Sequence, residues 1–153
     1  MTLRDLIHQT RFESAANEAL LNVIVTASWL NGEIAATLAP HGITNAQYNV
    51  LRILRGRHPA CATCSEIGER LLDRTPDVTR LLVRLESAGW VRRRRADHDR
   101  RVVEVEITDA GLALLASLDG PMAESTGRIA RHLSDDDLAR LSALLEVLRT
   151  DQT

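Results

Sequence analysis

The chain has 153 residues, of which 44% are hydrophobic and 26% charged, the composition of one globular domain. Aromatic residues make up only 3%, so we expect a core of Leu, Val, Ile and Ala in packed helices. The net charge of −2 excludes a globally basic, histone-like chain, and a count of two cysteines excludes a disulfide framework.

The N-terminal residues lack the apolar core of a signal peptide. The longest apolar stretch, residues 19–30, is interrupted by Asn22, Thr26 and Ser28. We interpret it as too short and too polar to span a membrane, and therefore expect a cytoplasmic protein that does not interact with a membrane.

The first long helix is expected over residues 14–38, after an arm or a short helix in residues 1–12. Its apolar stripe is broad enough for burial on two sides, one against the chain's own core and the other against a partner chain. Pro40 and Gly42 end this helix, and Thr44 is expected to cap the next one.

Two shorter helices follow, joined by a turn. Ser65 is expected to cap the first, residues 66–72, and Thr75 to cap the second, with Pro76 as its first helical residue. Gly89 stops the second helix. Its buried face is expected to consist of Val78, Leu81, Leu82 and Leu85. The pattern predicts a helix-turn-helix.

Residues 90–107 predict a β-hairpin with a basic tip. Val103, Val105 and Ile107 alternate with two glutamates, which is typical of a half-buried strand. Residues 90–101 carry six arginines and two aspartates, a net charge of +4. Such a hairpin can contact phosphates or enter a minor groove.

After the hairpin, Thr108 is expected to cap a long helix that Gly120–Pro121 kinks or divides, and Ser134 to cap the last helix. The acidic run at residues 135–137 is interpreted as capping and helix-dipole charge rather than as a metal cluster. The predicted fold is mainly α: a winged helix-turn-helix with a two-stranded β wing, set between N- and C-terminal helices.

These segments together resemble the MarR family of bacterial transcriptional regulators over residues 14–150. The matching pieces are L-T-x-x-Q-x-x-x-L at residues 43–51, the helix-turn-helix at 65–88, the wing entry at 89–93, D-R-R at 99–101 and L-T-x-x-G at 107–111. The chain departs from the family at Ala96–Asp97, where Asp-Pro is common, and in a longer segment at residues 57–63.

The resemblance implies a homodimer built from one compact domain. Residues 1–43 and 108–153 would supply dimerisation helices, and residues 44–107 the winged helix-turn-helix that binds DNA. The helix over residues 76–87 would enter the major groove, and the wing the adjacent minor groove, of a pseudo-palindromic operator in double-stranded DNA. Many members are repressors that a small aromatic or lipophilic effector releases from DNA.

No enzyme motif such as HExxH, GxSxG or a phosphate-binding glycine loop is present, so we expect neither catalysis nor a cofactor. The alternatives are a thiol-redox or metal-responsive regulator on the same scaffold, and a protein-interaction module that has lost DNA binding. The arginine-rich hairpin argues against the last of these.

In the helix that would enter the major groove, Arg80 is the candidate for a base contact, because arginine pairs well with guanine. The alternative for Arg80 is a solvated charge paired with Asp77 or Glu86. Thr75 and Thr79 could contact a phosphate or a thymine methyl group. The expected DNA-contacting residues of this helix are Thr75, Pro76, Asp77, Thr79, Arg80 and Arg84.

In the wing, strand alternation places Arg101 on the inner face and Arg100 on the solvent face. We expect Asp99 to brace Arg101, and one of the two arginines to enter the minor groove. Arg93 and Arg95 are expected to contact backbone phosphates. A plain charged turn is the alternative.

Cys61 and Cys64 form a C-x-x-C pair beside a helix N-terminus, where a thiol can be reactive. They could act as a redox switch or, with His58, as part of a metal site. The alternative is two ordinary small residues in a loop, and three ligands make an incomplete structural zinc site, so no metal is expected.

An effector pocket is expected between the first helix, the second helix and the start of the helix after the wing. Trp29, His41 and Tyr48 are its aromatic or titratable candidates. Packing in the core is the alternative for Trp29 and Tyr48.

Overall fold

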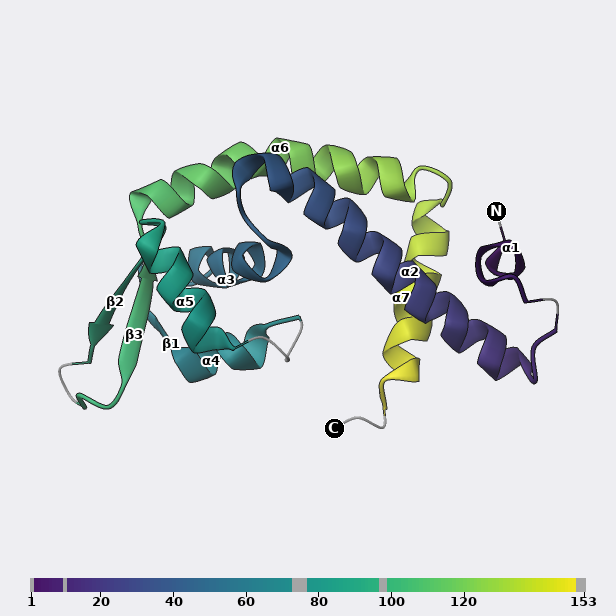
Figure 1. Ribbon diagram of the computed structural model, residues 1–153, viewed down its shortest axis with the longest axis horizontal. Coiled ribbons are helices and arrows are strands. Elements are labelled where there is room, and N and C mark those ends of the chain that lie inside the picture. Colours follow the sequence, from purple (N-terminus) through teal and green to yellow (C-terminus); the bar gives the residue numbers. More distant parts are fainter. Residues whose placement is uncertain (1, 10, 73–76, 97–98, 151–153) are drawn as a thin grey trace.

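The computed structural model describes residues 2–9, 11–72, 77–96 and 99–150. They form a mainly helical fold with one small antiparallel sheet (Figure 1). The helices are α1 (Leu3–Ile7), α2 (Ala15–Leu38), the 3-10 turn η1 (Ala39–His41), α3 (Asn45–Arg55), α4 (Cys64–Arg70), α5 (Val78–Ser87), α6 (Asp109–Ala130) and α7 (Asp135–Leu148). The strands are β1 (Ala62–Thr63), β2 (Val91–Arg95) and β3 (Val103–Ile107). This is the winged helix-turn-helix that the sequence predicts.

The long helices α2 and α6 form an arch that joins the two ends of the molecule (Figure 1). At one end lie α3, α4, α5 and the sheet, and at the other the chain turns from α6 into α7. Helix α6 packs against both α2 and α3. The largest fully buried side chains are Leu38, Val50, Leu51, Leu54, Ile67, Leu82, Leu85, Val105, Leu115 and Leu118. Each buried leucine stabilises the fold by about 1.5–3 kcal/mol, so this core holds the winged helix against the arch.

Three of the predicted helix caps are confirmed: Thr44 for α3, Thr108 for α6 and Ser134 for α7. At α7 the Asp137 carboxylate accepts hydrogen bonds from the Ser134 hydroxyl at 2.7 Å and from its backbone N–H at 3.2 Å. These bonds lower the pKa of Asp137 below its usual value. The interpretation of the acidic run as a helix cap is therefore confirmed for Asp137.

The prediction that Ser65 caps α4 is wrong, because the helix begins two residues earlier than predicted, at Cys64. The cap is Thr63, whose hydroxyl accepts from the backbone N–H of Glu66 at 3.3 Å, while the Glu66 carboxylate accepts from the Thr63 N–H at 2.7 Å. Thr63 also ends β1, so strand pairing positions the hydroxyl that starts the helix.

The prediction that Thr75 caps α5 is also wrong. Helix α5 begins at Val78, and its cap is Asp77, which accepts a hydrogen bond from the backbone N–H of Arg80 at 3.1 Å. Thr75 and Pro76 themselves lie outside the described residues.

The sheet contains one strand more than the predicted hairpin, in the order β1-β3-β2. Ala62 pairs with Val105 and Thr63 with Glu104, so β1 fixes the wing to the start of α4. A strand of two residues is too short to show the alternation of apolar and polar residues, so it could not be predicted from the sequence. Helix α6 continues through Pro121, and it bends rather than divides (Figure 1).

The expectation that the apolar stretch is too short and too polar to span a membrane is wrong on both counts. Helix α2 and its 3-10 extension form a 27-residue segment, Ala15–His41, that is long and apolar enough to cross a membrane by length and composition. Its most apolar window is not buried within this chain, and Leu20, Ile24 and Trp29 are exposed. The core helix of a soluble protein passes the same test.

Candidate nucleic-acid interface

Helix α5 turns its apolar face into the core and its polar face to solvent. Leu81, Leu82 and Leu85 are buried, as predicted, and Val78 packs at the edge of the core. Thr79, Arg80 and Arg84 lie exposed on the outer side. Within the described parts of the chain, the side chains of these two arginines form no ion pair.

The predicted alternative for Arg80, a pairing with Asp77 or Glu86, is therefore absent. Asp77 bonds the backbone N–H of Arg80, and Glu86 pairs with Arg93 instead. The Arg80 side chain is exposed at the surface of α5.

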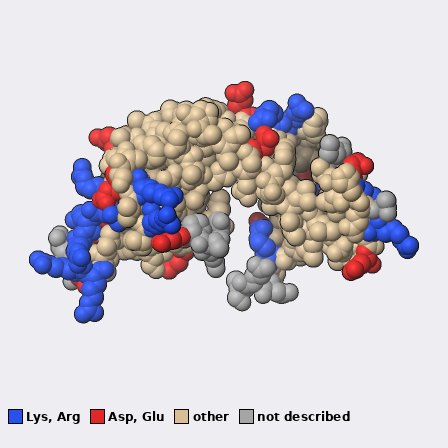
Figure 2. Space-filling view, viewed as in Figure 1, with Lys and Arg blue, Asp and Glu red and all other residues tan. Residues whose placement is uncertain are grey.

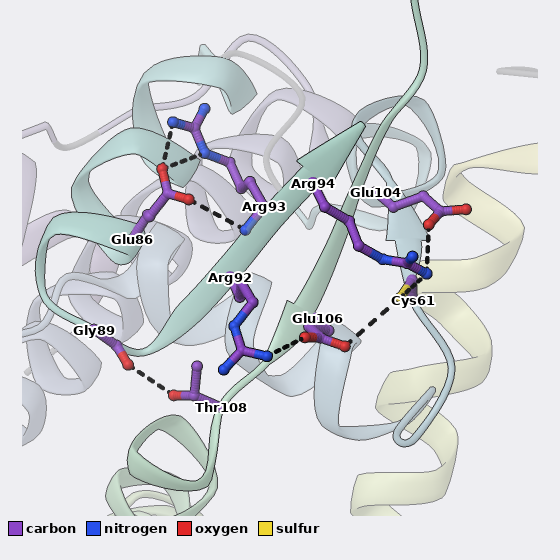
Figure 3. Close-up of polar contacts among 9 residues, drawn as sticks. All are labelled: Cys61, Glu86, Gly89, Arg92, Arg93, Arg94, Glu104, Glu106 and Thr108. Carbon is purple, nitrogen blue, oxygen red and sulfur yellow. Dashed lines mark hydrogen bonds and ion pairs between the residues drawn. The ribbon is translucent and has the colours of Figure 1, made fainter. Parts of the chain in front are cut away.

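The ion pair between Glu86 and Arg93 holds α5 against the wing (Figure 3). One carboxylate oxygen of Glu86 accepts from Nε of Arg93 at 2.8 Å and from its terminal guanidinium nitrogen, and the other accepts from the Arg93 backbone N–H at 3.2 Å. The bonds from the Arg93 side chain lower the pKa of Glu86. This ion pair orients the wing relative to α5, and the expected contact of Arg93 with phosphate stays a prediction.

On the outer face of the sheet, two further arginines of β2 are paired across the hairpin (Figure 3). Arg92 bonds Glu106 at 3.1 Å, and Arg94 lies 2.8 Å from Glu104. Both pairs join residues that stand opposite each other in the antiparallel register. The alternating glutamates of β3 and arginines of β2 are a sequence signal from which these pairs could have been found.

At the tip of the wing, polar contacts to the backbone shape the turn. The Arg95 guanidinium donates to the Arg100 carbonyl at 2.9 Å, and the Asp99 carboxylate accepts from the Arg101 backbone N–H at 2.9 Å. Asp99 thus braces the backbone of Arg101 and not its side chain. Arg101 is exposed rather than inward-facing, because β3 begins only at Val103 and strand alternation does not extend into the turn.

Arg100 and Arg101 are both exposed and form no ion pair with the described residues. Figure 2 shows basic side chains gathered at the end of the molecule where the wing and α5 lie. The structure therefore pairs the arginines at the base of the wing and leaves cationic groups at its tip and on α5.

The root of the wing is fixed to α6 by a close junction. The Thr108 hydroxyl donates to the Gly89 carbonyl at 2.7 Å, and the Thr108 N–H donates to the Trp90 carbonyl at 3.1 Å. Gly89 has a φ of +77°, which favours glycine at this turn. A Cβ on Gly111 would lie 2.3 Å from the Trp90 carbonyl oxygen, so α6 can approach only because residue 111 has no side chain.

Cys61 and Cys64 are half-buried free thiols that come directly before and directly after β1 in the chain. The Cys61 sulfur lies 3.8 Å from a guanidinium nitrogen of Arg94 and 3.9 Å from a carboxylate oxygen of Glu106 (Figure 3). Cys64 packs against the core. No group of three His, Cys, Asp or Glu side chains among the described residues could hold a metal, so the set of both cysteines with His58 forms no such site.

The predicted effector residues do not line the hollow between the end of α2 and the start of α3. This hollow has a volume of about 510 Å³ and is lined by Ala35, Ala39, Gly42, Ile43, Thr44, Asn45 and Ala46. Tyr48 is buried in the core below Arg52, whose guanidinium lies 5.9 Å from its ring centre. Trp29 is 49% exposed on α2, and His41 is half-buried.

The model of the MarR family matches residues 41–102, from the end of the 3-10 turn to the tip of the wing. A MarR transcription factor from Planctomyces limnophilus is 38% identical, with a TM-score of 0.70 over 90% of this chain and 99% of that one. The chain belongs to the MarR family. Members of this family are transcriptional regulators and not enzymes.

A mutant of Escherichia coli MarR complexed with operator DNA is 30% identical, with a TM-score of 0.76 over 89% of this chain and 99% of that one. The transcriptional regulator PecS of Dickeya dadantii is 34% identical over 100 residues, which are 65% of this chain and 60% of PecS. The chain thus spans less than two thirds of the length of PecS.

Proposed function

We propose that this MarR-family protein is a cytoplasmic, homodimeric, sequence-specific repressor that binds a pseudo-palindromic operator and leaves it when a small effector binds. The observation that carries the proposal is the placement of Arg80, Arg84, Arg100 and Arg101. These arginines are exposed on α5 and the wing tip, whereas their neighbours at the base of the wing are paired. A structural relative has been solved on operator DNA.

In the proposed complex, α5 lies in the major groove with Arg80 at a base edge, and Thr79 and Arg84 contact the backbone. The wing tip, with Arg100 and Arg101, enters the adjacent minor groove. Arg95 and Asp99 act indirectly, because their side chains hold the backbone of the tip. Residues 44–107 are thus the DNA-binding region.

The proposed dimer interface is formed by residues 1–43 and 108–153. Helices α2 and α7 expose large apolar side chains that a single chain leaves in water: Leu20, Val23, Ile24, Trp29, Leu141, Leu144, Val147 and Leu148. An exposed apolar surface of this kind is typical of an interface. A second copy of the chain would bury the apolar helix α2, which explains its membrane-like composition without a membrane.

The test is binding of the purified protein to its own upstream intergenic DNA and to random DNA across a salt series. If a dimer makes six phosphate contacts, its affinity should fall about a thousandfold between 50 and 200 mM salt. A symmetric footprint on the upstream DNA is expected. Equal affinity for both DNAs would contradict an operator at this position, and no binding at low salt would favour the interaction module.

For the effector, we propose the hollow between α2 and α3 as the binding site, because its walls are mainly small apolar side chains that suit an aromatic or lipophilic molecule. A screen of such molecules in the DNA-binding assay tests it. An effector found there should lose potency when Ala46 is replaced by Leu, which fills the hollow, while basal DNA affinity stays unchanged.

A thiol-responsive regulator is the second candidate, and the contact of Cys61 with Arg94 and Glu106 favours it. Oxidation of Cys61 would change the charge beside two wing residues, and so the orientation of the wing. Peroxide should lower DNA affinity in the wild type and not in Cys61→Ser. Unchanged affinity after complete oxidation of the thiol would contradict this candidate.

A further inference from the structure

Helix α5 carries one exposed apolar side chain, Val83, on a face that is otherwise polar. Val83 is 43% exposed. Among the described residues between 44 and 107, the exposed large hydrophobic side chains are Val83 and Leu72, and the others lie outside this range. Val83 therefore does not belong to the apolar surface that we assign to the dimer interface.

The helical geometry places Val83 near the centre of the outer face. At 3.6 residues per turn, Val83 lies about 60° around the axis from Arg80, and both point away from the buried Leu82 and Leu85. Because Thr79 and Arg80 are four and three residues before it, Val83 is their direct neighbour on this surface.

At this turn of α5, the methyl groups of Val83 are exposed beside a hydroxyl that already forms a hydrogen bond within the helix. The Ser87 hydroxyl donates to the Val83 carbonyl at 2.9 Å, so that its hydrogen is already engaged by the helix. The β-branched side chain is stiff, because it has one strongly preferred rotamer in a helix. A rigid pair of methyl groups thus lies beside two exposed arginines, Arg80 and Arg84.

We propose that Val83 selects a thymine, by packing its methyl groups against the C5-methyl group of that base in the major groove. This inference rests on the proposed binding of α5 to an operator. The thymine methyl is the apolar group that the major groove presents, and apolar side chains contact it. Arg80 and Arg84 supply the charge that brings this face against DNA, so the thymine is expected next to the base that Arg80 contacts.

The test replaces thymine by deoxyuridine, which keeps the base pair and removes only the methyl group. The DNA is the duplex that the wild-type protein selects from a random pool, with each thymine pair replaced symmetrically in both half-sites. Loss of one buried methyl group changes affinity about fourfold, so one symmetric replacement should weaken the wild type about 15-fold. Val83→Ser should bind the thymine duplex more weakly than the wild type does. Its affinity should not change when deoxyuridine replaces the thymine that Val83 contacts.

Val83→Thr, which keeps one of the two methyl groups, should show an intermediate sensitivity. Arg84→Ala is the control on the same face: it should bind all duplexes more weakly and keep the full sensitivity to deoxyuridine. Because Val83 is exposed, its variants are expected to fold, and an unchanged melting temperature will show that they do. Equal sensitivity of the wild type and Val83→Ser at every position would overturn the inference. A wild type that selects no sequence would instead overturn the proposed function, and the inference with it.

Discussion

At the scale of single residues, the arginines of this protein differ in their partners and not in their chemistry. Arg92, Arg93 and Arg94 are each paired with a glutamate of β3 or α5. Such exposed pairs contribute about 0–1 kcal/mol each to stability, so their main effect is to orient the hairpin. Arg80 and Arg100 form no ion pair with described residues, and these are groups that we propose to contact DNA.

Replacing Arg80 by Ala should weaken binding to the operator by about 1–3 kcal/mol per base contact and relax specificity at one position of each half-site. The measurement is titration against the operator and against single-position variants of it. Arg140→Ala, an equal change of charge on α7, is the control and should leave binding unchanged. Equal losses on operator and random DNA for Arg80→Ala would contradict a base contact.

Replacing Glu86 by Gln should destabilise the protein by about 0.5–1 kcal/mol at pH 7, a value reduced for the exposure of the pair. The folded-state pKa of Glu86 lies below its ordinary value of 4.5, because Arg93 donates hydrogen bonds to its charged form. The stabilisation is therefore complete above pH 4.5 and is lost as the pH falls through the lowered pKa.

Urea unfolding of the wild type and Glu86→Gln at a series of pH values measures this difference. Glu124→Gln on α6, whose side chain forms no ion pair with described residues, is the control and should change stability little at any pH. A difference that stays the same once the Glu86 carboxyl is protonated would show that the ion pair is not its cause.

At the scale of elements, the sequence predicted the helices well wherever one strong cap preceded an apolar pattern. Thr44, Thr108 and Ser134 are such caps, and each is confirmed. The predictions failed in the helix-turn-helix, where Ser65 competes with Thr63 two residues before it. Local spacing cannot decide between them, because the choice depends on the pairing of β1 with β3.

The partners within the site were predictable only in part. The pairs between β2 and β3 follow from the hairpin register, and could have been derived from the sequence. The pair of Glu86 with Arg93 could not, since it depends on how α5 docks on the sheet.

Replacing Gly111 by Ala should destabilise the protein by about 1–3 kcal/mol, because the added methyl group overpacks the junction with the Trp90 carbonyl. Gly127→Ala in the same helix is the matched control. Its Cβ would meet nothing within 4 Å, so it should be neutral or stabilise by up to about 1 kcal/mol. Thermal unfolding measures both, and similar melting temperatures for the two variants would contradict the close packing of α6 on the wing root.

At the scale of the whole molecule, the arch of α2 and α6 links the helices that we assign to the dimer with the winged helix (Figure 1). The ion pair of Arg128 with Glu33 at 2.9 Å and that of Arg55 with Asp119 at 3.0 Å join α6 to α2 and to α3. A change in the angle between two copies would therefore move the two α5 helices relative to each other.

Replacing Leu144 by Glu should convert the dimer into monomers, because this side chain is 67% exposed on the apolar face of α7 and a dimer would bury the new charge. Light scattering measures the mass, and the monomer should lose operator binding, since it engages one half-site. Leu72→Gln, at a position 88% exposed outside this face, is the control and should remain a dimer. A dimeric Leu144→Glu variant would place the interface elsewhere.

The division of the wing into a paired base and an open tip also bears on how the protein can evolve. A substitution at Arg92 or Arg94 removes one side of a cross-strand ion pair, which costs about 0–1 kcal/mol and a contact that orients the hairpin. Arg100 and Arg101 have no such ion pair among the described residues, so a substitution there breaks no cross-strand pair. If the tip contacts DNA as proposed, single substitutions at these two positions would change the DNA contacts and leave the paired base of the wing intact.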